Sequence, residues 1–210
     1  MDKLEIDVVS DVVCPWCYLG KRKLDAAIAQ APGLTFDIRW RPFQLDPTIP
    51  PEGLDRHEYM ARKFGPEKIA AIHERLTDAG REEGLTFNFS AIKRSPNTLD
   101  AHRLIRWSHA KDKQAQVVER LFALYFSEGA DIGDRDVLVQ VADEAGLDGA
   151  LVRRLLTDGT DTGSVREEVA TAARMGVSGV PFFIFGGKYA VSGAQPVDAL
   201  LGAIWKAASE

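Results

Sequence analysis

The stretch "SDVVCPWCYLG", from Ser10 to Gly20, holds both cysteines of the 210-residue chain, Cys14 and Cys17. Before it, "LEIDVVS" is rich in β-branched residues and alternates in polarity, which predicts a strand over Leu4–Ser10. After it, leucine and isoleucine recur at roughly helical spacing until a Pro-Gly pair ends the pattern. The cysteine pair therefore stands where a strand passes into a helix.

This position predicts a redox role for the two thiols. The unpaired backbone N–H groups and the dipole at a helix N-terminus favour an anion, so we expect a lowered pKa and a reactive thiolate at Cys14. Cys17 follows one turn later on the same face, at about the Cα separation of roughly 5–6 Å that a disulfide needs. We predict that Cys14 is the exposed nucleophile and that the more buried Cys17 resolves the mixed disulfide. Pro15 suits the first helical turn.

A zinc site and a pair of incidental buried cysteines are the alternatives to a redox pair. Zinc needs four ligands, and the chain has no second cysteine pair and no histidines at ligand spacing, so we expect no metal. The four histidines all fall in the middle of the chain: His57, His73, His102 and His109. Incidental cysteines are disfavoured by the C-x-x-C spacing between a strand and a helix.

The rest of the chain predicts the order β-α-β, a long helical stretch, then β-β-α. "LTFDIRWRPF" (Leu34–Phe43) alternates as a second strand, and helical patterns fill most of residues 55–175. Residues Val180–Phe185 read as a strand that turns back at a Gly-Gly pair. A last amphipathic helix is predicted to bury Ile204 and Trp205. We therefore predict a sheet domain of residues 1–50 plus 177–210, and an all-α insertion of residues 51–176. Within the insertion, Ser95 and Pro96 are typical of a helix start.

The composition narrows the partners and the location. A net charge of −5 and a pI near 5.5 disfavour a nucleic-acid partner. No apolar run reaches the roughly 18 residues of a membrane helix, so no membrane partner is expected. The first residues lack the apolar core of a signal peptide, so we expect a cytoplasmic protein. In that reducing compartment two cysteines are not a structural framework.

Four segments carry a resemblance to a known family: "SDVVCPWCYLG", "SPNTLDAHRL", "GVSGVPFFIF" and "VSGAQP". Together with the element order they resemble the DsbA-like branch of the thioredoxin superfamily, and within it the FrnE-type cytoplasmic dithiol oxidoreductases. The resemblance covers nearly the whole chain. It implies an α/β, thioredoxin-like fold (β-α-β … β-β-α) with a large all-α insertion.

The resemblance also implies a substrate platform beside the cysteines. Pro181 would be a cis-proline that faces the active-site disulfide, and the Val180 backbone would pair with an extended substrate strand. Pro15 and Trp16 would lie beside the bound substrate. Packing of the Trp16 ring in the core is the alternative.

The same branch contains glutathione-using relatives, the kappa-class glutathione transferases and the 2-hydroxychromene-2-carboxylate isomerases. In those relatives serine stands where Cys14 stands, and this chain departs from that pattern. A glutathione pocket would include Asn97, Val180, Ser192 and Gln195.

Two polar residues have open roles. His102 would either lie near the cysteines and stabilise the Cys14 thiolate or substrate, or pack on an insertion helix, and we favour packing. Asp11 would either relay protons to Cys17 or form the turn before the helix, and we favour the turn.

The sequence thus predicts a thiol–disulfide oxidoreductase or protein disulfide isomerase that uses the CPWC pair. A glutathione-dependent isomerase or transferase acting on a small aromatic compound is the alternative, and a binding or chaperone module with an inert C-x-x-C is a third. We expect no tightly bound cofactor, with glutathione as a candidate co-substrate. The partners would be protein or small thiol and disulfide substrates, and monomer and homodimer both stay open.

Overall fold

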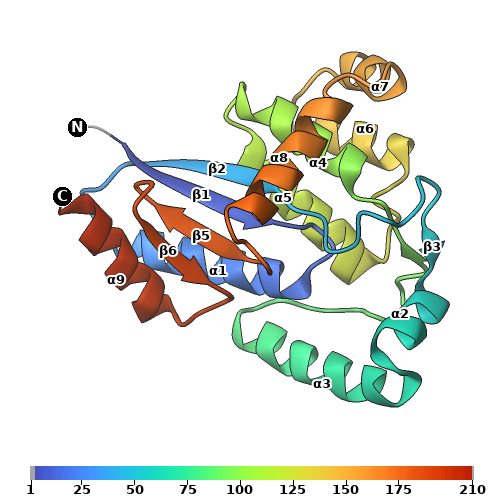
Figure 1. Ribbon diagram of the computed structural model, residues 1–210, viewed down its shortest axis with the longest axis horizontal. Helices are drawn as coiled ribbons and strands as arrows, with labels where there is room; N and C mark the ends of the chain where they lie inside the picture. The colour runs from blue at the N-terminus through green and yellow to red at the C-terminus, as the bar shows by residue number, and fades with distance from the viewer. Residues whose placement is uncertain (1–2, 210) are drawn as a thin grey trace.

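The computed structural model describes residues 3–209 and is built around a four-stranded mixed sheet (Figure 1). The strand order is β2-β1-β5-β6, with β1 parallel to β2 and antiparallel to β5, and with β5 antiparallel to β6. The strands are β1 (Leu4–Ser10), β2 (Phe36–Pro42), β5 (Phe182–Phe185) and β6 (Tyr189–Ser192). The predicted strands are confirmed, except that β5 begins after Pro181, which has no N–H to give to a ladder.

Helices α1 (Pro15–Ala29) and α9 (Val197–Ala208) pack against each other and cover one face of the sheet (Figure 1). Ile6 and Val8 of β1 are fully buried in the core that lies on this side. In α9, Ile204 is fully buried there, whereas Trp205 is 42% exposed. The prediction that Trp205 is buried was wrong, because the next residue along a helix is rotated by about 100° and leaves the apolar stripe.

Helix α8 (Thr162–Arg174) crosses the opposite face of the sheet, in front of it in Figure 1. Val9 of β1 points to this side and forms a small buried cluster with Ala172 and Val177. Strand β1 is therefore buried on both faces, which explains its consecutive valines.

Between β2 and α8 the chain forms mostly helices, as predicted. The elements are β3 (Leu54–Asp55), α2 (Arg56–Phe64), α3 (Pro66–Glu82), β4 (Arg94–Ser95), α4 (Leu99–His109), α5 (Gln114–Ala123), the π-helical turn η1 (Leu124–Glu128), α6 (Arg135–Glu144) and α7 (Gly149–Thr157). None of the helices in the described chain is long and apolar enough to cross a membrane. The predicted boundaries between the sheet domain and the insertion, after residue 50 and after residue 176, fall between β2 and β3 and between α8 and β5.

The insertion differs from the sequence prediction at Ser95. Strands β3 and β4 form a two-residue antiparallel ladder in which Leu54 is opposite Ser95. Because Ser95 belongs to this ladder, it does not cap a helix, and α4 begins at Leu99 instead of Pro96. The predicted α/β fold with a helical insertion is confirmed, with this short ladder added.

An aromatic cluster joins α1 to the insertion. The ring of Tyr18 in α1 stacks on Phe122 of α5 at 4.9 Å between centroids, and Phe122 meets Trp40 of β2 edge-on at 6.5 Å. One hydrophobic core runs from the sheet through these rings into the helices of the insertion. Helix α1 is therefore held by both parts of the chain.

Removing the central ring of this cluster should cost much of the stability. We expect Phe122→Ala to lower the free energy of unfolding by about 3–5 kcal/mol, because the ring is fully buried and would leave a cavity. Urea unfolding followed by fluorescence measures this. Leu151→Ala is the control, since Leu151 is 40% exposed and its loss should cost less than about 0.5 kcal/mol. Equal losses in the two variants would contradict the role of the cluster.

Candidate active site

The turn after β1 places Cys14 at the N-terminus of α1. The N–H of Cys14 donates to the carbonyl oxygen of Asp11 at 2.9 Å, and Cys14 is the N-cap residue with an extended backbone. Pro15 occupies the first helical turn, as predicted. No side chain of the described chain caps this N-terminus, which leaves its first N–H groups without a side-chain acceptor beside Cys14.

Both cysteines are free thiols, and both are buried. Cys17 is 1% exposed, as predicted, but Cys14 is only 4% exposed, so the prediction of an exposed Cys14 was wrong. Cys14 is buried because the loop before β5 lies against it, and its thiol donates to the carbonyl oxygen of Val180 in that loop at 3.6 Å. Cys14 instead reaches solvent through a cavity that it lines.

The environment of Cys17 favours the neutral thiol. Burial raises the pKa of Cys17 well above its ordinary range, and the neighbouring Cys14 raises it further. The Ser10 side chain and the Asp11 backbone act in the opposite direction and do not outweigh burial.

The Val180–Pro181 peptide bond is cis, as the resemblance implied. The Pro181 ring packs on α1 at Gly20, where an added Cβ would lie 2.8 Å from Pro181 Cγ. The Pro181 carbonyl accepts a hydrogen bond from Gly193 N–H at 2.8 Å. A residue without a side chain in α1 therefore lets the loop come close to Cys14.

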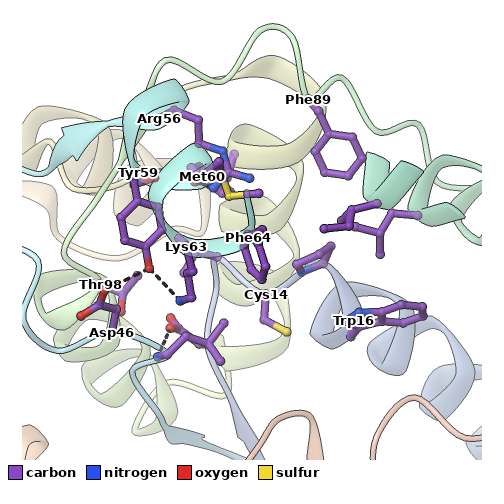
Figure 2. Close-up of a pocket in the computed structure, with 18 of the residues that line it drawn as sticks. Cys14, Trp16, Asp46, Arg56, Tyr59, Met60, Lys63, Phe64, Phe89 and Thr98 are labelled. Atoms are coloured by element: carbon purple, nitrogen blue, oxygen red, sulfur yellow. Dashed lines mark hydrogen bonds between the residues drawn. The ribbon is translucent and has the colours of Figure 1, made fainter. Parts of the chain in front are cut away.

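A cavity of about 490 Å³ opens in front of Cys14. It lies between the start of α1 and the helices α2 and α3 of the insertion (Figure 2). Its apolar wall includes Val13, Trp16, Leu45, Ile49, Met60, Phe64, Ile72, Leu76 and Phe89. Its polar and charged lining includes Asp11, Asp46, Arg56, Tyr59, Lys63, His73, Arg75 and Tyr125.

Tyr59 organises one side of this cavity. Its hydroxyl donates to Asp46 Oδ2 at 3.1 Å and accepts from Lys63 Nζ at 2.8 Å (Figure 2). Burial, followed by the Asp46 charge, raises the pKa of Tyr59, so it remains a neutral phenol. At the back of the cavity Arg56 donates to the Tyr125 hydroxyl at 3.0 Å, and burial raises the pKa of Tyr125 to about 12.

Trp16 lies on the cavity wall and does not pack in the core. It is 37% exposed, and the Arg75 guanidinium of α3 stands over its ring at 5.4 Å from the centroid. The structure therefore agrees with the prediction of an accessible ring beside Cys14.

His102 is a packed residue, as favoured from the sequence. It is 4% exposed, its Nε2 donates to the Phe43 carbonyl oxygen at 2.8 Å, and it lies 3.3 Å from Asp11 Oδ1. It does not line the cavity. The other Asp11 oxygen accepts from Leu45 N–H at 2.8 Å, so Asp11 forms the turn, as favoured, and its role as a proton relay stays a hypothesis.

The residues predicted for a glutathione pocket do not all line this cavity. Of its four residues only Val180 lines the cavity. The Asn97 side chain is engaged with the Ile49 carbonyl oxygen at 2.6 Å and with Gln44. Gln195 is exposed and donates to the carbonyl oxygen of Ser192, in the connection between β6 and α9. Asn97 is used to tie two loops together, and Gln195 lies outside the cavity lining.

Sequence reasoning missed the contribution of α2 and α3. Arg56, Tyr59 and Lys63 come from α2, and Arg75 comes from α3. The spacing of Tyr59 and Lys63 at i and i+4 was a readable signal for their contact, but the sequence does not show which face of α2 meets Cys14. Within the described chain no group of three His, Cys, Asp or Glu side chains could hold a metal ion.

The geometry of this site defines a class: a thioredoxin-like fold with a C-x-x-C pair at a helix N-terminus beside a cis-proline. The family model of the DSBA-like thioredoxin domain matches residues 5–205, and the chain belongs to this family, whose members are generally oxidoreductases and isomerases.

Comparisons with individual proteins agree with this family assignment. The chain is 29% identical over 184 residues to the uncharacterized protein YwbO of Bacillus subtilis (strain 168), with 87% of each covered. It is similar to the crystal structure of a probable DsbA oxidoreductase, SCO1869 from Streptomyces coelicolor, with a TM-score of 0.88, 30% identity and coverage of 99% and 91%. The cytosolic disulfide reductase DsbM from Pseudomonas aeruginosa with GSH shares the fold, with a TM-score of 0.69, 18% identity and coverage of 98% and 100%.

A side chain at Gly20 should disturb the contact between α1 and the proline loop. We expect Gly20→Ala to lower the free energy of unfolding by about 1–3 kcal/mol, because the rigid Pro181 ring must move. It should also change the rate at which Cys14 is alkylated. The control is Gly202→Ala in α9, where nothing lies within 4 Å and helix propensity should add up to about 1 kcal/mol. A stabilising Gly20→Ala would contradict the contact.

Burial of Cys17 makes the reduced protein sensitive to alkaline pH. The folded state keeps the Cys17 proton longer than the unfolded state does, so this contribution to stability is complete below about pH 8.5 and falls as pH rises toward the folded pKa. The slope should reach about 1.4 kcal/mol per pH unit. Urea unfolding of the reduced protein at several pH values, compared with reduced Cys17→Ala, measures it. Parallel curves for the two proteins would refute it.

Proposed function

We propose that this protein is a thiol–disulfide oxidoreductase in which Cys14 attacks and Cys17 resolves. One observation carries the proposal: Cys14 stands at the N-terminus of α1, between the cis-proline loop and an open cavity, while Cys17 lies buried one turn behind it. The backbone N–H groups at this N-terminus stabilise a thiolate on Cys14.

The chemistry in the reducing direction has two steps. The Cys14 thiolate attacks one sulfur of a substrate disulfide, a new S–S bond forms to Cys14, and the first substrate thiolate leaves and takes a proton from water. Cys17 then loses its proton to water, its thiolate attacks Cys14 Sγ, and the second substrate thiolate leaves. The substrate disulfide is reduced to two thiols, and the cysteine pair is oxidised to one disulfide.

The raised pKa of Cys17 supports this sequence, in which Cys14 attacks first and Cys17 second. While Cys17 is a neutral buried thiol, it does not compete for the substrate. Burial is the largest cause of the raised Cys17 pKa, and formation of the mixed disulfide removes the further contribution of the neighbouring Cys14 thiol. Attack by the second cysteine therefore becomes easier once the first has reacted.

The loop before β5 would orient the substrate. The Val180 carbonyl oxygen is 3.6 Å from Cys14 Sγ, so a chain or small molecule joined to this sulfur must pass along Val180 and Pro181. This position supports the proposed backbone pairing with an extended substrate.

Protein disulfide isomerase activity and a cytoplasmic location belong to the same proposal. Isomerisation uses the same first attack, followed by release of Cys14 by another substrate thiol. The shared fold of the cytosolic disulfide reductase with GSH supports a cytoplasmic role with glutathione as co-substrate. A glutathione-dependent isomerase of a small aromatic compound is the second candidate, because the cavity is largely apolar beside Cys14.

A redox titration in graded reduced and oxidised glutathione tests the proposal. We expect Cys14 and Cys17 to close reversibly, with a potential in the range of roughly −270 to −120 mV, read by thiol alkylation and mass. Cys14→Ser should abolish reduction of a disulfide substrate. Cys17→Ser should trap a mixed disulfide on Cys14 and stop turnover.

The Cys17 variant separates the two candidates. An oxidoreductase loses turnover in Cys17→Ser, whereas a glutathione-dependent isomerase keeps most of its activity. Absence of an internal disulfide at every glutathione ratio, with glutathione retained non-covalently, would overturn the oxidoreductase proposal.

A further inference from the structure

Three cations of the described chain line the cavity in front of Cys14 and form no direct ion pair. Across the described residues, Arg56, Lys63 and Arg75 form no ion pair within 4.0 Å, although many other cations of the protein do. By comparison, Lys21 and Arg22, on α1, both pair with Glu119. Lys63 reaches Asp46 only through the Tyr59 hydroxyl that both groups contact. Cations at a cavity wall that form no direct ion pair keep N–H donors for an anion.

Each of the three cations is placed by an aromatic ring of the same cavity. Lys63 lies 5.1 Å from the centroid of Tyr59. Arg56 lies 5.7 Å from the ring of Tyr125, and Arg75 lies 5.4 Å from the ring of Trp16. Cation–π contact holds these groups in position but leaves their N–H donors available on the open side.

The carboxylates that line the cavity are already engaged. Asp11 accepts a hydrogen bond from Leu45 N–H and contacts His102, and Asp46 accepts from Tyr59 and from Thr48. The two acids therefore accept hydrogen bonds from the loops and from Tyr59, while the three cations at the cavity wall form no direct ion pair.

The apolar part of the cavity wall indicates which ligand would fit between the cations. Trp16, Leu45 and Phe64, three of the large apolar side chains that the protein leaves partly exposed, all line this cavity. A volume of about 490 Å³ is in the range of small-molecule sites. A ligand that fits both features has an apolar body and at least one negatively charged oxygen group.

Lys63 and Cys14 line the same cavity. In Figure 2 Trp16 lies on one side of Cys14, and the Lys63 ammonium group, directed to the Tyr59 hydroxyl, lies on the other. Its hydrogen bond to the Tyr59 hydroxyl uses one of its three N–H donors.

We propose that the substrate of this site is a small disulfide with an apolar body and carboxylate groups, and that Lys63 is its specificity-determining residue. This inference rests on the proposed oxidoreductase function. Lys63 and the two arginines bind the carboxylates while the disulfide lies at Cys14, and the apolar wall holds the body. The chemistry is the two-step reduction given above.

Single-turnover reduction of two aromatic disulfides tests the inference. The anionic probe is 5,5′-dithiobis(2-nitrobenzoate), and the neutral probe is 4,4′-dithiodipyridine. Each is mixed with the fully reduced protein, and thiol release is followed by absorbance. The ratio of the two rates is divided by the same ratio for free dithiothreitol, which removes the intrinsic reactivity of the probes. We expect the protein to prefer the anionic probe by about tenfold or more.

Variants of Lys63 assign the preference. Lys63→Met should slow reaction with the anionic probe about tenfold more than reaction with the neutral one, and Lys63→Arg should restore the preference. Lys111→Met is the matched control, since Lys111 is exposed in the turn after α4 and does not line the cavity. It should leave both rates unchanged.

The outcomes separate the two proposals. Equal normalised rates for the two probes, or an equal loss with both in Lys63→Met, would overturn the inference and leave the oxidoreductase function standing. If neither probe oxidises the Cys14–Cys17 pair, both proposals fail.

Discussion

The close packing of the Val180–Pro181 loop against the start of α1 is the contact that makes the site. It exists because Gly20 has no side chain where the Pro181 ring lies, and because the turn at Asp11 ends β1 just before Cys14. These constraints place the Cys14 thiol 3.6 Å from the Val180 carbonyl oxygen. Two segments more than 160 residues apart in the chain thus meet at one sulfur atom.

The sheet and the insertion both contribute to the site. The sheet supplies both segments that carry the chemistry, because β1 leads into the cysteine turn and pairs directly with β5, which follows Pro181. The insertion supplies the far wall of the cavity through α2 and α3. The aromatic contacts of Tyr18 with the insertion fix α1 relative to that wall, so the cysteines and the cavity keep one geometry.

The two thiols have different environments. Cys14 has the N–H groups of a helix terminus and an open cavity beside it, whereas Cys17 has a buried surrounding that disfavours charge. The cavity adds three cations that lie against aromatic rings and form no direct ion pair within the described chain. This difference supports the proposed roles of Cys14 as the nucleophile and Cys17 as the resolving thiol, and the cations support the proposed preference for anions.

Features that depend on neighbours along the chain could be predicted from the amino-acid sequence alone. Alternation and helical spacing predicted β1, α1 and the order of elements, and C-x-x-C between a strand and a helix predicted the place of the two cysteines at the start of α1, because these signals lie within a few residues of one another. Features that join distant segments came from tertiary packing. The Val180 loop buries Cys14, Ser95 joins a ladder with Leu54, and Asn97 ties two loops together away from the cavity. Lys63 and Trp16 also meet at the cavity only through tertiary packing. The sequence around α2 has no local pattern that shows how this helix packs on the rest of the chain.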